Sequence, residues 1–323
     1  MLYLLDPEPR TLNAEPFIAM PSRPYRHILV LADIEGSSGC GSYRASSFLT
    51  HPWASACMAM AKDVDAVVRA LFTAGVPEVT VKDFHRTAYN LLPERIDGRA
   101  RIVCGYRRGP VPGLGTPGGA DAVMMLGMHA AAGTNGFLAH TLTSRLAALE
   151  VNGRPLAEVE LFAASLAPYG IPAIFFSGCP EACSQARERI PGIQTLSIDK
   201  SVSPDRLKKR HWRGQLAQAA VQALANDTVS PYLPEGPFRA EITVRDGPAA
   251  ASKMADPWGY PRSGSRVLIE APDIHALYNR LIRLCYLPPK VEKTLPFGLM
   301  FYNAIGWLGR QWVRWQLRAL SRR

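Results

Sequence analysis

The chain has 323 residues, of which 47% are hydrophobic and 20% are charged, and its formal net charge is +10. This length and apolar fraction suffice to bury a core in one large domain or two smaller ones, and they exclude a disordered chain, a collagen and a coiled coil. The charge is unevenly distributed, because residues 278–323 carry nine basic side chains and one acid, leaving +2 on residues 1–277. The basicity therefore belongs to a C-terminal tail.

The cysteines and the apolar runs indicate a cytoplasmic protein. The six cysteines contain no CxxC pair, which in a chain of this length is typical of reduced thiols. The first residues lack the basic and long apolar regions of a signal peptide, and no run of 18 uninterrupted apolar residues predicts a membrane span.

After a proline-rich segment over residues 1–26, which we expect to be an extended arm, apolar β-rich runs alternate with helical patterns. The predicted strands are 27–32, 78–81, 101–104, 122–126, 148–151, 154–156, 171–176, 194–198, 239–244 and 266–270. The predicted helices are 57–74, 159–167, 181–189, 204–225 and 274–284. This alternation predicts an α/β fold with helices on both faces of a mostly parallel sheet. The Asn152-Gly153 hairpin signal predicts that the sheet is mixed.

Acids and histidines stand where several predicted strands end. Asp33 and Glu35 follow the first strand, His85 follows the second, and His129 follows the strand over 122–126. Ligands of α/β sheets bind at the carboxyl ends of the strands, where these side chains can converge. Carboxylates and imidazoles held by rigid elements suit Zn²⁺ or Mn²⁺. Solvated loop residues are the alternative interpretation.

Two further residues are open to both functional and structural interpretations. His140 lies in an apolar stretch eleven residues after His129, as a core histidine or as a general acid or base near a metal. Glu158 follows the predicted hairpin, where it could be an ordinary acid in the first turn of a helix.

Taken together, these segments resemble the D-aminopeptidases of the DppA type, a family of dinuclear zinc peptidases. The matching pieces occur in the family's order; they are Ala32-Asp33-Ile34-Glu35-Gly36, Lys82-Asp83-Phe84-His85, Leu126-Gly127-Met128-His129, Ala139-His140 and Asn152-Gly153-Arg154-Pro155-Leu156-Ala157-Glu158.

The resemblance implies a three-layer α/β/α fold, two zinc ions per subunit and ring-shaped homo-oligomers. The metal ligands that it implies are Asp33, Glu35, His85, His129 and Glu158, with Asp33 bridging the two ions. His140 would be the catalytic histidine. The implied activity is release of N-terminal D-amino acids from short peptides such as D-Ala dipeptides. A catalytic domain would then span residues 27–287, between the arm and a tail over 288–323.

Other functions remain possible from the sequence alone. One is a different metal-dependent amidohydrolase that acts on cell-wall-derived substrates, and another is a membrane-docked metal-binding protein without turnover. Nucleic acid is not expected as a partner, because binding RNA or DNA would need a broader basic face than one tail provides.

The tail predicts an amphipathic helix from Phe297 onward. Arginines recur every four residues on one face, and the expected apolar face consists of Phe301, Ile305, Leu308, Trp312, Trp315 and Ala319. This pattern fits docking on the same subunit or on a neighbour in a ring, and it equally fits a helix lying on an anionic membrane surface.

Overall fold

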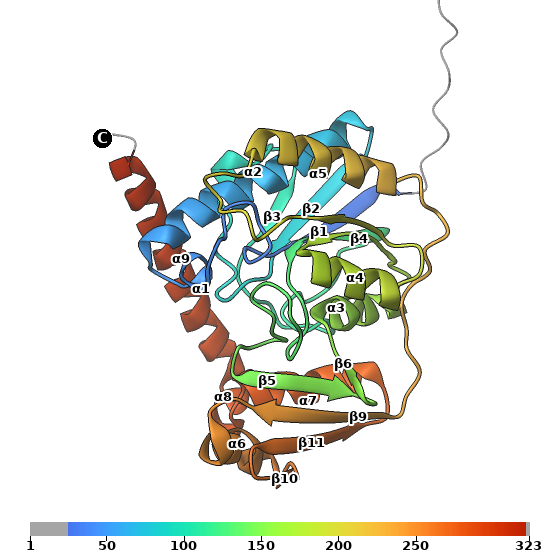
Figure 1. Cartoon of the computed structure of the whole chain (residues 1–323), viewed down its shortest axis with the longest axis vertical. Coiled ribbons are helices and arrows are strands. Elements are labelled where there is room, and N and C mark those ends of the chain that lie inside the picture. The colour runs from blue at the N-terminus through green and yellow to red at the C-terminus, as the bar shows by residue number, and fades with distance from the viewer. Residues whose placement is uncertain (1–24, 321–323) are drawn as a thin grey trace, which may run out of the picture.

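The structure is a computed structural model that describes residues 25–320. Its central sheet has six strands, all parallel, in the order β3-β2-β1-β4-β7-β8 (Figure 1). These strands are β1 (His27–Ala32), β2 (Glu78–Asp83), β3 (Arg101–Val103), β4 (Ala122–Met128), β7 (Ala173–Gly178) and β8 (Gln194–Ser197). Because β1, β4 and β7 are buried along their whole length, they read as continuous apolar runs.

Helices cover both faces of this sheet. On one face lie α2 (His51–Thr73) and α5 (Lys209–Ala223), and on the other lie α3 (Glu158–Leu166) and α4 (Pro180–Arg189) (Figure 1). The three-layer α/β/α arrangement is therefore confirmed. The short α1 (Tyr43–Ser46) precedes α2, and single 3₁₀ turns occupy Pro93–Arg95, Ala167–Tyr169 and Asp256–Trp258.

The predicted hairpin belongs to a second sheet and not to the central one, which is therefore wholly parallel and not mixed. This antiparallel sheet has the order β10-β11-β9-β5-β6. Its strands are β5 (Leu146–Val151), β6 (Arg154–Pro155), β9 (Phe238–Val244), β10 (Arg262–Ser263) and β11 (Arg266–Ala271), accompanied by α6 (Gly247–Ala255), α7 (Ile274–Tyr286) and α8 (Pro289–Lys293). Buried and more exposed side chains alternate along β9 and β11, which is typical of an antiparallel sheet that covers a core with one face only. The hairpin pairs with this half-exposed sheet and not with the fully buried central one.

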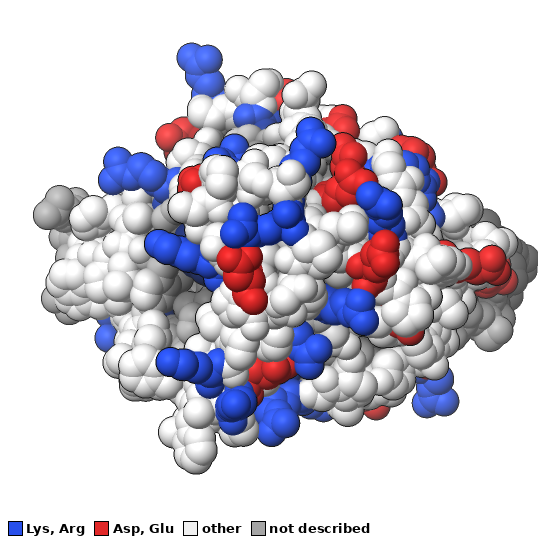
Figure 2. Space-filling view, turned by 90° about the horizontal axis from the view of Figure 1, so that it is seen from below, with Lys and Arg blue, Asp and Glu red and all other residues white. Residues whose placement is uncertain are grey.

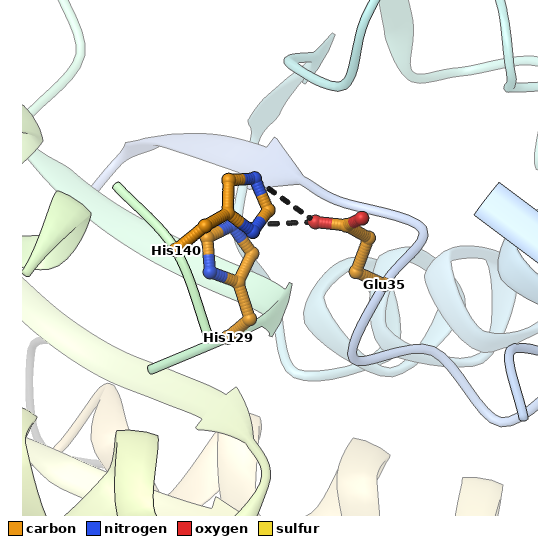
Figure 3. Close-up of side chains that lie close together, drawn as sticks. All are labelled: Glu35, His129 and His140. Carbon is orange, nitrogen blue, oxygen red and sulfur yellow. Dashed lines mark ion pairs between the residues drawn. The ribbon is translucent and has the colours of Figure 1, made fainter. Parts of the chain in front are cut away.

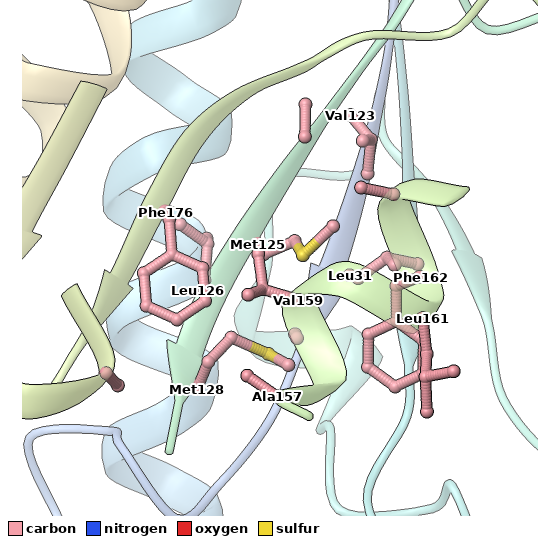
Figure 4. Close-up of a cluster of buried hydrophobic side chains, with 14 of the residues drawn as sticks. Leu31, Val123, Met125, Leu126, Met128, Ala157, Val159, Leu161, Phe162 and Phe176 are labelled. Atoms are coloured by element: carbon pink, nitrogen blue, oxygen red, sulfur yellow. The ribbon is translucent and has the colours of Figure 1, made fainter. Parts of the chain in front are cut away.

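Apolar side chains fill the space between the central sheet and α3. Leu31, Met125 and Met128 of the sheet face Val159 and Phe162 of α3, all of them buried (Figure 4). Because α3 also contacts α7, it joins the central sheet to the antiparallel sheet. Close packing of this kind fixes the start of α3 relative to the ends of β1 and β4.

The C-terminal tail forms one long helix, α9 (Leu295–Leu320), which runs from the antiparallel sheet to α2 along one edge of the molecule (Figure 1). Docking of the tail on its own subunit is thus observed. The docking face matches the expected one only in part. Trp312 stacks on Trp53, whereas Phe301, Leu308 and Trp315 point outward with 69%, 59% and 61% of their surface exposed.

Several other expectations can be compared with residues 25–320. None of the six cysteines, all of which lie in this range, forms a disulfide. No helix in the range is long and apolar enough to cross a membrane. Nearly all of the predicted arm falls outside the described residues. On the side seen from below, basic and acidic side chains are interspersed and form no patch of one sign (Figure 2).

Candidate metal centre and active site

The candidate site lies where the carboxyl ends of three parallel strands meet the start of α3. Asp33 and Glu35 directly follow β1, His85 follows β2, and His129 follows β4. Since β1 lies between β2 and β4 in the sheet, these three strand ends are adjacent. Glu158 is the first residue of α3, to which the β5–β6 hairpin leads. The antiparallel sheet therefore supplies the connection that brings Glu158 to the central sheet.

The side chains form three overlapping groups. Within each group, the potential ligand atoms lie within 4.8 Å of one another. One group contains Asp33, Glu35 and His85, and a second contains Asp33, His129 and Glu158. The third group contains Glu35, His129 and His140. Asp33 is common to the first two groups, which is the position that a bridging carboxylate requires.

His129 stands at the centre of the cluster. Its Nε2 atom lies 3.6 Å from Oδ2 of Asp33, 3.4 Å from Oε2 of Glu35 and 3.6 Å from Oε2 of Glu158. On the other side of Glu35, Nε2 of His85 lies 3.7 Å from Oε1. The five residues expected as ligands are thus brought to one place.

His140 joins the same cluster from the loop that follows β4. Its ring stacks on that of His129 at 4.0 Å between centroids, and both rings face Glu35 (Figure 3). The Nε2 atom of His140 lies 3.5 Å from Oε2 of Glu35, while Nδ1 is 2.8 Å from the carbonyl oxygen of Leu138.

Two glycines allow the strand ends to approach one another closely. Gly127 has a φ of +73°, and a Cβ atom there would overlap the carbonyl oxygen of Asp33. A Cβ on Gly36 would overlap the backbone of Gly127 and Met128, and its N–H donates to Gly127 O at 2.6 Å. Only glycine fits both positions, so the loop after β1 lies directly against the end of β4.

The sequence profile of the D-aminopeptidase family matches residues 27–282, about four fifths of the chain. The chain belongs to the D-aminopeptidase family. The chain is 26% identical to the D-aminopeptidase of Bacillus subtilis (strain 168) over 149 residues. These residues make up 46% of this chain and 54% of the relative. The alignment thus spans about half the length of that curated relative.

A solved structure has the same fold as this D-aminopeptidase family member. It is described as the Zn-dependent D-aminopeptidase DppA from Bacillus subtilis, a self-compartmentalizing protease. The TM-score is 0.71 and the identity 24%, over 81% of this chain and 97% of the relative. The family resemblance noted in the sequence is thereby confirmed.

Burial and neighbouring charges shift the pKa values of the acids and histidines in the candidate site. Burial, reinforced by the other carboxylates, raises the pKa of Asp33 to about 6. Burial opposes protonation of His129, but Glu158, Glu35 and Asp33 outweigh it and raise the pKa of His129 to about 9. The pKa of Glu35 is lowered despite its burial, because three imidazoles face it. Burial and His129 lower the pKa of His140.

This donor set fits divalent cations. Three carboxylates that are 8% exposed or less would repel one another without a compensating positive charge. Two donors about 2.1 Å from a tetrahedral Zn²⁺ are about 3.4 Å apart. The observed separations of 3.4–3.7 Å are close to that value and long for hydrogen bonds. Oε2 of Glu35 also has no hydrogen-bond partner among the described residues.

Residues that the sequence did not single out hold the candidate ligands in place. Asp83 is fully buried, and its carboxylate accepts hydrogen bonds from the backbone N–H groups of His85, Asn90 and Leu91. The Lys200 ammonium donates to the carbonyl oxygens of Ser37 and Cys40 in the loop after β1. Neither Asp83, two residues before His85, nor Lys200, just after β8, carries a sequence signal that distinguishes it from other charged residues.

Proposed function

We propose that this protein is a zinc-dependent aminopeptidase that releases N-terminal D-amino acids from short peptides, D-Ala-type dipeptides among them. The observation that carries the proposal is the pair of donor groups that share Asp33. Membership of the D-aminopeptidase family and similarity to the D-aminopeptidases of Bacillus subtilis support the substrate class.

The two donor groups assign the residues to two ions per subunit. Asp33, Glu35 and His85 would hold one ion, and Asp33, His129 and Glu158 the other. Two dications next to three carboxylates and two neutral imidazoles form a nearly balanced set of charges. When bound, such a pair of ions supplies a water of lowered pKa and polarises the scissile carbonyl.

His140 is the best placed residue to move protons in this site. Its lowered pKa favours the neutral ring at neutral pH, and donation of Nδ1–H to Leu138 O leaves Nε2 as an acceptor facing Glu35. A neutral imidazole here takes up the proton released as water adds to the peptide carbonyl and passes it to the departing amine. We therefore favour a base that becomes an acid over a histidine protonated from the start.

The test compares hydrolysis of D-Ala-D-Ala and L-Ala-L-Ala by the zinc-loaded chain. We expect turnover of the D-dipeptide, and at least a hundredfold loss of kcat in His140→Ala with zinc content retained. His211→Ala, which removes an exposed histidine outside the site, is the matched control. Zinc bound by a chain that cleaves neither dipeptide would contradict the proposal and favour metal binding without turnover. Cleavage of wall-derived amides alone would instead favour another amidohydrolase.

We also propose a homo-oligomer, in the form of a ring, on the basis of the relative described as self-compartmentalizing. Light scattering of the purified chain measures the mass directly. A monomer at micromolar concentration would contradict this proposal.

For the tail, we propose that the outer face of α9 contacts an anionic lipid surface from the cytoplasmic side. This outer face consists of Phe297, Met300, Phe301, Trp307, Leu308 and Trp315, each at least 49% exposed. Helix α9 contains no acid, and beside its C-terminal half lies a groove of about 630 Å³ lined by Lys62, Arg95, Arg314 and Arg318 together with Glu94. An apolar face flanked by cations is typical of helices that lie in a membrane interface.

Co-sedimentation with phosphatidylglycerol vesicles tests the lipid contact. We expect binding that Phe301→Glu with Leu308→Glu abolishes and that Leu233→Glu, an exposed apolar residue elsewhere, leaves unchanged. Equal binding by all three proteins would contradict the contact. A change in oligomeric mass without vesicle binding would assign the face to a second copy.

A further inference from the structure

The helix α9 contacts the loop that carries the metal-ligand candidate His85, although it lies outside the family match, which ends at residue 282. We infer that α9 is a positioning element of the metal centre, and that this chain uses a segment from beyond the family core to hold His85. The inference rests on the proposed zinc site.

The first observation is that two tyrosines hold the residues on either side of His85. One tyrosine belongs to α9 and the other is hydrogen-bonded to it. Tyr302 of α9 donates its hydroxyl to the carbonyl oxygen of Arg86 at 3.2 Å. Tyr106 donates its hydroxyl to the carbonyl oxygen of Phe84 at 3.1 Å. The two tyrosine rings stack at 6.2 Å, so the carbonyls before and after His85 are held by one aromatic pair.

Asn303 of α9 fixes the second tyrosine. Its Oδ1 atom accepts the Tyr106 N–H at 2.9 Å, and its Nδ2 atom donates to the Tyr106 carbonyl oxygen at 3.1 Å. Two hydrogen bonds from one amide side chain fix both the position and the orientation of a backbone segment.

A second path leads from α9 to the backbone of His85 itself. Trp312 of α9 stacks on Trp53 of α2 at 6.0 Å, and Trp53 Nε1 donates to Oδ1 of Asn90 at 2.8 Å. Asn90 Nδ2 in turn donates to the carbonyl oxygen of His85 at 2.8 Å. Contacts from two separate turns of α9 thus converge on the backbone around His85.

The loop has a conformation that needs such support. Arg86 has a φ of +52° and Ala88 a φ of +57°, in the left-handed region that side chains with a Cβ avoid. Strained residues of this kind persist only where surrounding contacts over-determine them. Here those contacts include the bond from Tyr302 to Arg86.

The imidazole of His85 lacks the usual means of orientation. Metal-binding histidines almost always donate their second ring N–H to a carboxylate, a carbonyl or water. Nδ1 of His85 is buried and has no hydrogen-bond partner among residues 25–320, so the ring orientation depends on where the backbone is held. The contacts of α9 with the backbone on both sides of His85 therefore help to set where the ring lies.

Metal titration of the full-length chain tests the inference. The variants are Tyr302→Phe, which keeps the ring and removes only the hydroxyl, and Tyr302→Phe combined with Asn303→Ala. Phe301→Ala, which alters an outward-facing neighbour, is the matched control. The readouts are the stepwise affinities for Co²⁺, its visible absorption spectrum, and the melting temperature of the metal-free chain.

We expect the double variant to weaken one binding step by about tenfold or more, the same step that His85→Ala weakens, with a changed Co²⁺ spectrum. Phe301→Ala should leave both steps unchanged. A lower melting temperature with unaltered affinities would overturn the inference and leave α9 a merely structural helix. Dipeptide turnover is measured separately, so a chain that binds two ions without cleaving D-Ala-D-Ala would contradict the proposed function and not this inference.

Discussion

The candidate ligand His129 has to lose a proton before it can bind a cation. His85 shares this behaviour, because Glu35 and Asp33 outweigh its burial and raise its pKa. With a pKa of about 9, His129 is protonated at pH 7, whereas Asp33, with a pKa of about 6, is largely ionised. Three carboxylates facing one imidazole are the cause, and they would equally attract the cations that displace this proton.

From this we predict that zinc affinity rises with pH. One proton must leave His129 below its pKa of about 9, so the apparent affinity should increase by about tenfold per pH unit from about pH 7 to 9 and then level off. Calorimetry in two buffers of different ionisation enthalpy measures the protons released. An affinity that is constant from pH 7 to 9 would refute the raised pKa, and His211→Ala should keep the wild-type slope.

The raised pKa of His129 also affects the stability of the metal-free chain. A histidine whose pKa is raised on folding, here from 6.5 to about 9, contributes stability that is fully present below pH 6.5. That contribution is lost as the pH rises through 9. We therefore expect the free energy of unfolding contributed by His129 to fall over the window in which zinc affinity rises.

Single residues of the site could be found from the sequence because each stands at a recognisable place. Asp33, His85 and His129 each follow a run that the sequence predicts to be a strand of the central sheet. Asp83 also stands at the end of such a run, yet its oxygens accept backbone N–H groups and face no ligand group. The residue type and position of Asp83 are those of a ligand, so only the three-dimensional contacts separate it from Asp33.

At the level of the helix, α9 shows how an amphipathic pattern can predict a helix and yet give only part of its docking face. Trp312 of the predicted face does dock, stacked on Trp53, but the fully buried residues of the helix are Gly306, Gly309 and Val313. Glycines let the helix backbone lie against the rings of Tyr89 and Phe48. Hydrophobicity alone therefore mispredicts the face wherever close approach decides the packing.

We predict that Gly306→Ala destabilises the chain by about 1–3 kcal/mol, because a Cβ atom there would overlap the ring of Tyr89. Gly298 lies on the same helix and has no atom closer than Val291 Cγ1 at 4.0 Å, so Gly298→Ala should stabilise by up to about 1 kcal/mol. Urea unfolding of both variants gives the two free energies. Equal effects of the two substitutions would show that the close approach of α9 does not matter.

Over the whole molecule, the α/β class was predictable, but the division into two sheets was not. Alternating strands and helices favour a parallel sheet, and the β5–β6 turn correctly predicted a hairpin. The partner of β5, however, is β9, whose pairing joins residues about 90 positions apart. No local pattern encodes such a pairing, so the sequence could not show that Glu158 reaches the site from a second sheet.

Because the candidate ligands come from distant parts of the chain, we expect metal binding to depend on the stability of the whole fold. Asp33, His85 and His129 end separate strands, and Glu158 begins the helix that joins the two sheets. The unfolded chain cannot assemble this set, so zinc at a thousandfold excess over its dissociation constant should stabilise the fold by about 4 kcal/mol for each ion bound. We therefore predict that chelation lowers the melting temperature by roughly 8 °C for each ion removed.

Scanning calorimetry with and without a chelator makes the measurement, with Glu158→Gln as the comparison. This variant should lose part of the stabilisation by zinc, because one of the two donor groups contains Glu158 and the other does not. If chelation left the wild-type melting temperature unchanged, the buried carboxylates would have to be tolerated without cations. An unchanged melting temperature would therefore argue against a metal centre, because removing bound cations should expose the repulsion between these carboxylates.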